Sequence, residues 1–122
     1  MANDFKRFTK PDVGTSTGAS ADAVYTVPAG AGSTALESIV IGITLANKAS
    51  TGVTADVFLD NEDGSNDVYI VKGASIPAGS SLEVMAGNKL VVQNDGSNAD
   101  VLRVESSRAS SLDATISVLE DV

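Results

Sequence analysis

Short segments of alternating apolar and polar residues recur along the chain from Ala23 onward. The clearest runs from Leu36 to Leu45, with Val40 among the small and polar residues of one face. The apolar face of this segment holds Ile39, Ile41, Ile43 and Leu45. A period of two residues predicts a strand with one buried face. Weaker alternation predicts further strands at Val24–Val27, Val53–Leu59, Val68–Val71, Leu82–Val84, Leu90–Val92, Leu102–Val104 and Ile116–Val118.

A short turn phrase occurs twice between these segments. Pro28-Ala29-Gly30 precedes the strand that opens at Leu36, and Pro77-Ala78-Gly79 precedes the strand that opens at Leu82. Proline cannot donate to a sheet ladder, and glycine adopts turn dihedrals that other residues resist. Each phrase therefore predicts a corner between two strands.

The spacing of strands and turns indicates the fold class. About eight short strands with regular turn signals are typical of an antiparallel sandwich or barrel, and no window holds an apolar stripe long enough for a crossover helix. We expect a single all-β domain over residues 23–122, an antiparallel β-sandwich or jelly-roll-like domain.

Residues 1–22 differ in composition from the rest. Residues 14–21 are small and polar, and such a segment cannot bury enough apolar surface to fold alone. We expect a flexible N-terminal arm over residues 1–22. Phe5 and Phe8 are then either incidental or anchors on a neighbouring subunit. Deleting the arm should weaken attachment of the protein to that neighbouring subunit and leave the domain folded.

Composition and charge narrow the functional classes. The 122 residues include no cysteine, histidine or tryptophan, so disulfides and Cys/His zinc sites are excluded. The net charge of −8 argues against a nucleic-acid partner, which requires gathered basic residues, and against attraction to anionic membranes. The N-terminal residues lack the apolar stretch of a signal peptide, and no run is long enough to span a bilayer.

Two polar loops are the candidates for cation binding. Asp60–Asp67 is rich in oxygen ligands, but aligning Gly64 with the invariant glycine of an EF-hand places Leu59 and Ile70 at ligand positions. Asp-Gly turn chemistry in a hairpin loop explains the segment better. Residues 93–98 form a similar loop, for which we expect a hairpin. We assign neither loop a metal and expect no cofactor.

Nothing in the sequence indicates an enzyme. A serine or threonine nucleophile needs a base, and the chain has no histidine. The Gly-x-Ser-x-Gly elbow and nucleotide-binding glycine loops are absent, and we expect the carboxylates to be solvated on loops and polar strand faces. We therefore predict a protein without catalytic residues.

The aromatic residues are the candidates for interaction. Phe58 breaks the alternation of its strand, so we expect it to be exposed for a subunit or glycan contact. Tyr25 and Tyr69 are better explained as core or corner residues. The interaction candidates are therefore Phe5, Phe8 and Phe58.

The order of these phrases carries a family resemblance over about residues 23–122. It comprises Val24-Tyr25-Thr26-Val27-Pro28-Ala29-Gly30, Leu36-Glu37-Ser38-Ile39-Val40-Ile41, Ile76-Pro77-Ala78-Gly79-Ser80-Ser81-Leu82-Glu83-Val84, Asn88-Lys89-Leu90-Val91-Val92 and Ile116-Ser117-Val118-Leu119-Glu120. This layout resembles a family of small virion structural proteins of tailed bacteriophages. The resemblance implies a β-sandwich without catalytic residues that attaches to the particle at the head, neck, tail or fibres.

These observations lead to one hypothesis and two alternatives. We expect a capsid decoration or cement protein, located in the virion and assembled in the host cytoplasm. Its partners would be the major capsid protein or other virion subunits, and further copies of itself, as a trimer or through edge pairing. The alternatives are a neck, tail or fibre accessory protein and a glycan- or receptor-binding module.

Overall fold

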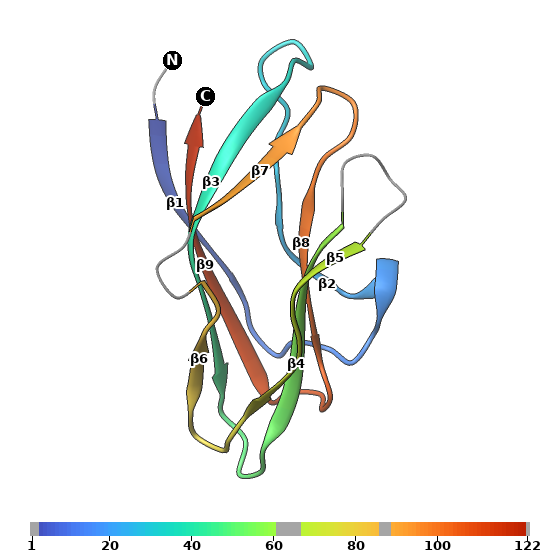
Figure 1. Ribbon diagram of the computed structural model, residues 1–122, viewed down its shortest axis with the longest axis vertical. Coiled ribbons are helices and arrows are strands. Elements are labelled where there is room, and N and C mark those ends of the chain that lie inside the picture. Colours follow the sequence, from blue (N-terminus) through green and yellow to red (C-terminus); the bar gives the residue numbers. More distant parts are fainter. Residues whose placement is uncertain (1–2, 61–66, 86–88, 122) are drawn as a thin grey trace.

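The computed structural model describes residues 3–60, 67–85 and 89–121, which form nine strands in two antiparallel sheets (Figure 1). The strands are β1 (Asn3–Lys10), β2 (Asp22–Thr26), β3 (Leu36–Asn47), β4 (Val53–Asp60), β5 (Asp67–Ile76), β6 (Ser81–Glu83), β7 (Leu90–Asn94), β8 (Val101–Ser106) and β9 (Leu112–Asp121). A 3₁₀ turn, η1, lies at Gly18–Ser20. The predicted all-β sandwich is confirmed. No helix in these residues is long and apolar enough to cross a membrane.

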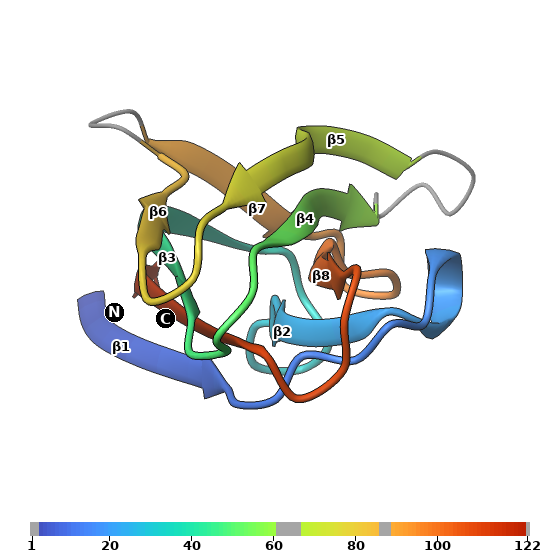
Figure 2. The same cartoon turned by 90° about the horizontal axis from the view of Figure 1, so that it is seen from below.

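The two sheets pack face to face, as Figure 2 shows from below. Sheet A has the order β1-β9-β3-β6, and β7 also pairs with β3. Strand β3 is 12 residues long, so its first half pairs with β7 and its second half with β6. Sheet B has the order β2-β8-β4-β5.

Both Pro-Ala-Gly phrases carry the chain from sheet B to sheet A. The first lies between β2 and β3, and the second lies between β5 and β6. Gly79 has φ of 71°, a left-handed conformation that glycine adopts without a steric penalty. The predicted corners are confirmed, and each one changes sheets. The loop at residues 93–98, expected to be a hairpin, also crosses between sheets, because β7 belongs to sheet A and β8 to sheet B.

Strand β3 departs from the expected alternation because it contains a bulge. The pairing of β3 with β9 shifts between Val40 and Gly42, so Ile41 is an extra residue. Val40 consequently faces the core and is fully buried, while Ile39 and Ile41 turn outward. Two of the four isoleucine and leucine positions predicted for the buried face, Ile43 and Leu45, do lie there.

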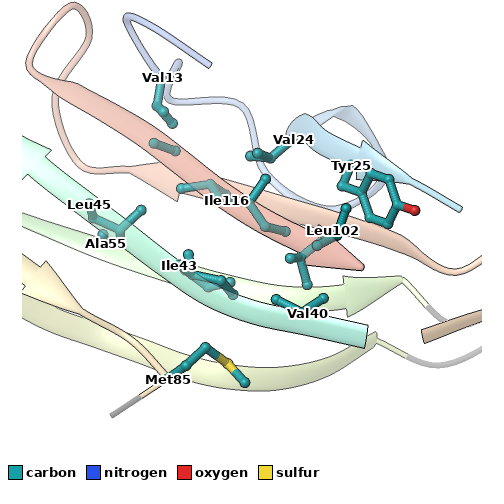
Figure 3. Close-up of a cluster of buried hydrophobic side chains, with 14 of the residues drawn as sticks. Val13, Val24, Tyr25, Val40, Ile43, Leu45, Ala55, Met85, Leu102 and Ile116 are labelled. Atoms are coloured by element: carbon teal, nitrogen blue, oxygen red, sulfur yellow. The ribbon is translucent and has the colours of Figure 1, made fainter. Parts of the chain in front are cut away.

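The core lies between the sheets and draws on almost every strand. Figure 3 shows side chains of β2, β3, β4, β8 and β9 meeting in the interior. The labelled members are Val13, Val24, Tyr25, Val40, Ile43, Leu45, Ala55, Met85, Leu102 and Ile116. Val13 and Met85 come from connecting segments, so these segments also contribute to the core.

The N-terminal segment differs from the expected arm. Residues 3–10 form β1, which pairs with β9 without a register shift. Val13 is fully buried, and its N–H donates to the carbonyl of Leu112 at 2.8 Å. The charged residues of β1 hide its strand character in the sequence, because an edge strand can present charges even on its inward side.

Candidate functional site

Phe58 is not the exposed aromatic that the sequence predicts. Its side chain is fully buried, and its ring centroid lies 5.2 Å from that of Tyr69 on β5. The pairing of β4 with β8 has no shift, so Phe58 alternates with Val57 and lies on the side of the strand that carries Asp56 and Asp60. It is buried there, outside the main core cluster, with Tyr69 packed against it. Tyr69, expected in the core or at a corner, is instead 42% exposed.

Phe8 also points into the protein. It is half-buried against the core, and its ring centroid lies 4.8 Å from that of Tyr25 on β2. Tyr25 is buried, as the sequence predicts. The contact packs β1 of sheet A against β2 of sheet B. The position of Phe8 is therefore explained by packing within one chain, without a neighbouring subunit.

Phe5 is the interaction candidate that remains on the surface. It is 79% exposed on the outer side of sheet A. The strand register aligns Phe5 with Leu119, Ile39 and Val91, so one apolar residue from each of β1, β9, β3 and β7 lies in a line. We call these four residues the apolar row. Val91, at its far end, is 59% exposed.

The surface beside the apolar row combines small polar residues with two carboxylates, Glu37 on one side and Glu83 on the other. The bulge residue Ile41 adds apolar surface, and Ser117 pairs with Gly42 in the next register position. Beyond them, three threonines align across β1, β9 and β3: Thr9, Thr115 and Thr44. Arg7 on β1 is the neighbouring cation. An apolar row with polar and charged residues around it suits contact with another protein.

A buried polar cluster lies inside, behind the apolar row. The Tyr25 hydroxyl donates to Glu120 Oε2 at 2.6 Å and shares a hydrogen bond with Ser38 Oγ at 2.9 Å. Lys6 Nζ lies 3.0 Å from Glu120 Oε1, so the 2% exposed carboxylate has a cation beside it. Burial, followed by the hydrogen bond to Glu120, raises the pKa of Tyr25. The cluster connects β1, β2, β3 and β9, and its role is to hold the edge of the sandwich together.

A second polar feature lies on the outer side of sheet B. Asp56 of β4 and Glu105 of β8 are cross-strand partners whose side chains share a hydrogen bond. Glu105 is 7% exposed, and its Oε2 accepts the N–H of Gly18 at 2.9 Å. Burial, then the hydrogen bond with Asp56, raises the pKa of Glu105. Burial alone would raise the pKa of Asp56, but the N–H of Gly73, Glu105 and Lys72 together lower it.

The pair faces an open cleft of about 280 Å³. Every side chain that lines it carries a hydroxyl or a carboxylate: Thr15, Thr17, Thr54, Asp56, Glu105, Ser106 and Ser107. Such a lining repels anions and offers hydrogen bonds to a neutral polar ligand. The sequence predicts solvated carboxylates and does not reveal this pair, because only the register of β4 with β8 brings the two residues together.

The acidic loop Asp60–Asp67 is described only at its ends. Asp60 Oδ2 accepts a hydrogen bond from Arg103 Nε at 3.0 Å, and Asp67 is its partner in the register with β5. Residues 61–66 lie outside the described residues. In the other loop, the Asp95 carboxylate accepts the N–H groups of Asn98 and Ser97, which lower its pKa. Across residues 3–60, 67–85 and 89–121, no three carboxylates gather as a metal site.

Comparisons with known proteins do not assign the chain to a family. No protein-family model matches it, and no curated protein is significantly similar to it. The resemblance to virion proteins therefore depends on the turn-and-strand phrases, and support for a function comes from the two outer surfaces of the sandwich.

Proposed function

We propose that this protein is a non-enzymatic structural subunit of a bacteriophage virion, and specifically a decoration or cement protein of the capsid. The observation that carries the proposal is the apolar row, which continues across four strands of sheet A and begins at the exposed Phe5. The resemblance of the turn-and-strand phrases to phage virion proteins supports the phage particle as the place of assembly. The partner would be the major capsid protein.

Physical chemistry supports an assembly role for this surface. Burying apolar area contributes about 25 cal/mol per Å², and aromatic residues at the centre of an interface contribute most. Phe5 and Val91 are the two most exposed large apolar side chains among the described residues. A partner that covers the apolar row would remove both from water, with the threonines beside it forming a polar rim.

The first experiment measures copy number in purified virions by quantitative mass spectrometry against the major capsid protein. We expect hundreds of copies in a fixed ratio to the shell protein. A few copies, up to some tens, would move the protein to the neck, tail or fibres. Absence from the particle would refute the virion role.

A second experiment tests the surface itself. The double variant Phe5→Ser/Val91→Ser should lose binding to capsids that lack the protein. The matched control is Val68→Ser, because Val68 is 49% exposed but lies on β5 of sheet B. Equal binding by both variants would exclude the apolar row as the attachment surface.

A glycan- or receptor-binding role is the second candidate, and the cleft beside Asp56 and Glu105 favours it. Carboxylates and hydroxyls together can accept and donate hydrogen bonds to the hydroxyls of a sugar. A glycan array with the wild-type protein and Asp56→Asn tests this role. We expect a hit that Asp56→Asn abolishes if the cleft binds sugars, and an array without hits would refute it.

A further inference from the structure

The free edges of the two sheets differ in how well they are protected from pairing. Strands β6 and β7 have three and five residues, and β2 has five with a register shift. Strand β5 is longer, but its pairing shifts twice, and Gly73 within it has φ of 65°. Bulges and short length are the usual means of preventing edge association.

Strand β1 has neither a bulge nor a short length, and only its charged side chains oppose edge pairing. It is eight residues long, contains no proline or glycine, and pairs with β9 without a shift. None of the described strands pairs with its other side, and it forms the outer margin of sheet A in Figures 1 and 2. Its unpaired N–H and C=O groups are therefore a template for another strand.

The side chains of β1 discriminate between self-pairing registers. In a twofold antiparallel pair centred on Phe5, Phe5 lies opposite Phe5 of the second copy, and Asp4 lies opposite Lys6 of the second copy. The register centred on Asp4 places two Asp4 side chains together, and those centred on Lys6 or Arg7 place like cations together. A register centred on Phe8 sets Lys6 against Lys10. Opposite charges directly across a pair stabilise it and like charges destabilise it.

We propose that two copies of this chain pair through β1, antiparallel and centred on Phe5. The inference specifies a partner for the proposed structural subunit, and it rests on that function only in treating the chain as one that assembles. The two A sheets become one continuous sheet, and the two apolar rows join end to end at the Phe5 pair. Each Lys6 then lies between Glu120 of its own chain and Asp4 of the second copy.

Charge restricts how this edge can pair with its own copy. Lys6, Arg7 and Lys10 outnumber Asp4, so two β1 strands repel each other except where Asp4 lies opposite a cation, as it does in the register centred on Phe5. Asp4 is exposed, and reversing its charge leaves the pairing of Lys6 with Glu120 in place. The Asp4 carboxylate is therefore the position at which the dimer can be broken without disturbing the monomer.

Sedimentation equilibrium on the full chain tests the dimer. We expect the wild type to dimerise and Asp4→Lys to weaken the dimer about ten-fold or more, since two ion pairs become like-charge contacts. Asp67→Lys, the same substitution at the exposed end of β5, is the matched control and should dimerise like the wild type. A monomeric wild type, or an Asp4→Lys variant that dimerises normally, would overturn the proposal.

Crosslinking tests the register. The chain has no cysteine, so Phe5→Cys introduces one thiol whose two copies face each other within the separation of a cross-strand pair, about 4.5–5.5 Å between Cα atoms. In the same register two copies of Thr9→Cys lie about 26 Å apart along the strands. A short bismaleimide should crosslink the first variant and not the second, and equal crosslinking would refute the register.

The same variants separate this inference from the virion role. If Asp4→Lys is monomeric and the wild type dimeric, but neither enters virions, the pairing stands and the proposed function fails. If the wild type is a monomer that still attaches to virions, the pairing fails and the function stands.

Discussion

Replacing Tyr25 with phenylalanine removes one buried hydroxyl group and should destabilise the protein. The Tyr25 hydroxyl is the hydrogen-bond donor to Glu120 Oε2 and also contacts Ser38 Oγ, and all three side chains are buried. Phenylalanine keeps the ring that packs against Phe8, so the packing of β1 on β2 is retained. The variant therefore isolates the polar contribution of the cluster.

The magnitude follows from what the substitution leaves behind. A hydrogen bond to a charged group contributes about 1.5–3 kcal/mol, and a buried acceptor without its donor incurs a desolvation penalty of similar size. Lys6 remains beside Oε1 of Glu120, and the Ser38 hydroxyl can reorient toward the carboxylate, so part of the loss is recovered. We expect the free energy of unfolding to fall by about 2–3 kcal/mol, or the Tm by about 8–12 °C for a chain of this length.

Urea unfolding followed by circular dichroism measures this change. Tyr69→Phe is the matched control, because Tyr69 is 42% exposed and its hydroxyl does not enter the cluster. The pKa of Tyr25 is raised above its ordinary value, so the unfolded chain releases this proton first and the wild type loses stability as pH rises above about 10. The difference between wild type and variant should therefore shrink there. A loss below about 0.5 kcal/mol at neutral pH would refute the reasoning.

Three further substitutions test other parts of the molecule. Phe58→Ala should cost about 3–5 kcal/mol in unfolding free energy, because the side chain is fully buried; a loss under 1 kcal/mol would contradict its burial. Burial and the hydrogen bond with Asp56 raise the pKa of Glu105. The folded protein therefore still holds this proton at pH values just above about 4.5, where the unfolded chain releases it, and the free energy of unfolding falls as pH rises from there. Glu105→Gln should remove this fall, which urea midpoints at pH 4 and pH 8 would detect, and an unchanged fall would exclude Glu105 as its source. Asn47→Ala should lower the free energy of unfolding in urea by about 2 kcal/mol, because the Asn47 amide donates to the carbonyls of Thr51 and Ile76 at 2.9 and 3.0 Å. An unchanged free energy of unfolding would show that these hydrogen bonds do not stabilise the fold.

Much of the fold follows from local patterns in the sequence. Alternation predicts strands where β3, β4, β8 and β9 lie, and the two Pro-Ala-Gly phrases predict corners because proline and glycine act on the backbone locally. Such patterns do not determine where a bulge falls. The predicted burial of Ile41 is wrong because the residue lies at a bulge. The predicted exposure of Phe58 is wrong because Tyr69 of the neighbouring strand packs against it on the outer side of sheet B.

The candidate sites were harder to predict because they depend on pairing between distant segments. The apolar row takes one residue from each of four strands, and only their register aligns them. Asp56 and Glu105 resemble ordinary solvent-facing residues of two alternating strands. Their environment changes because η1 approaches from residues 18–20 and supplies the N–H of Gly18 to the Glu105 carboxylate.

The position of β1 changes what a truncation should do. From the sequence alone, deleting residues 1–22 is expected to weaken attachment and leave a folded domain. Strand β1 pairs with β9 along its whole length, and Val13 is fully buried. Its removal would expose Ile116, Val118 and Glu120 at a new sheet edge, and would leave that carboxylate without Lys6. We therefore expect the truncated chain to unfold at lower urea than Phe5→Ser, which removes an exposed side chain alone. A truncated chain as stable as Phe5→Ser would mean that β1 contributes nothing to the fold, and would restore the arm as an independent attachment segment.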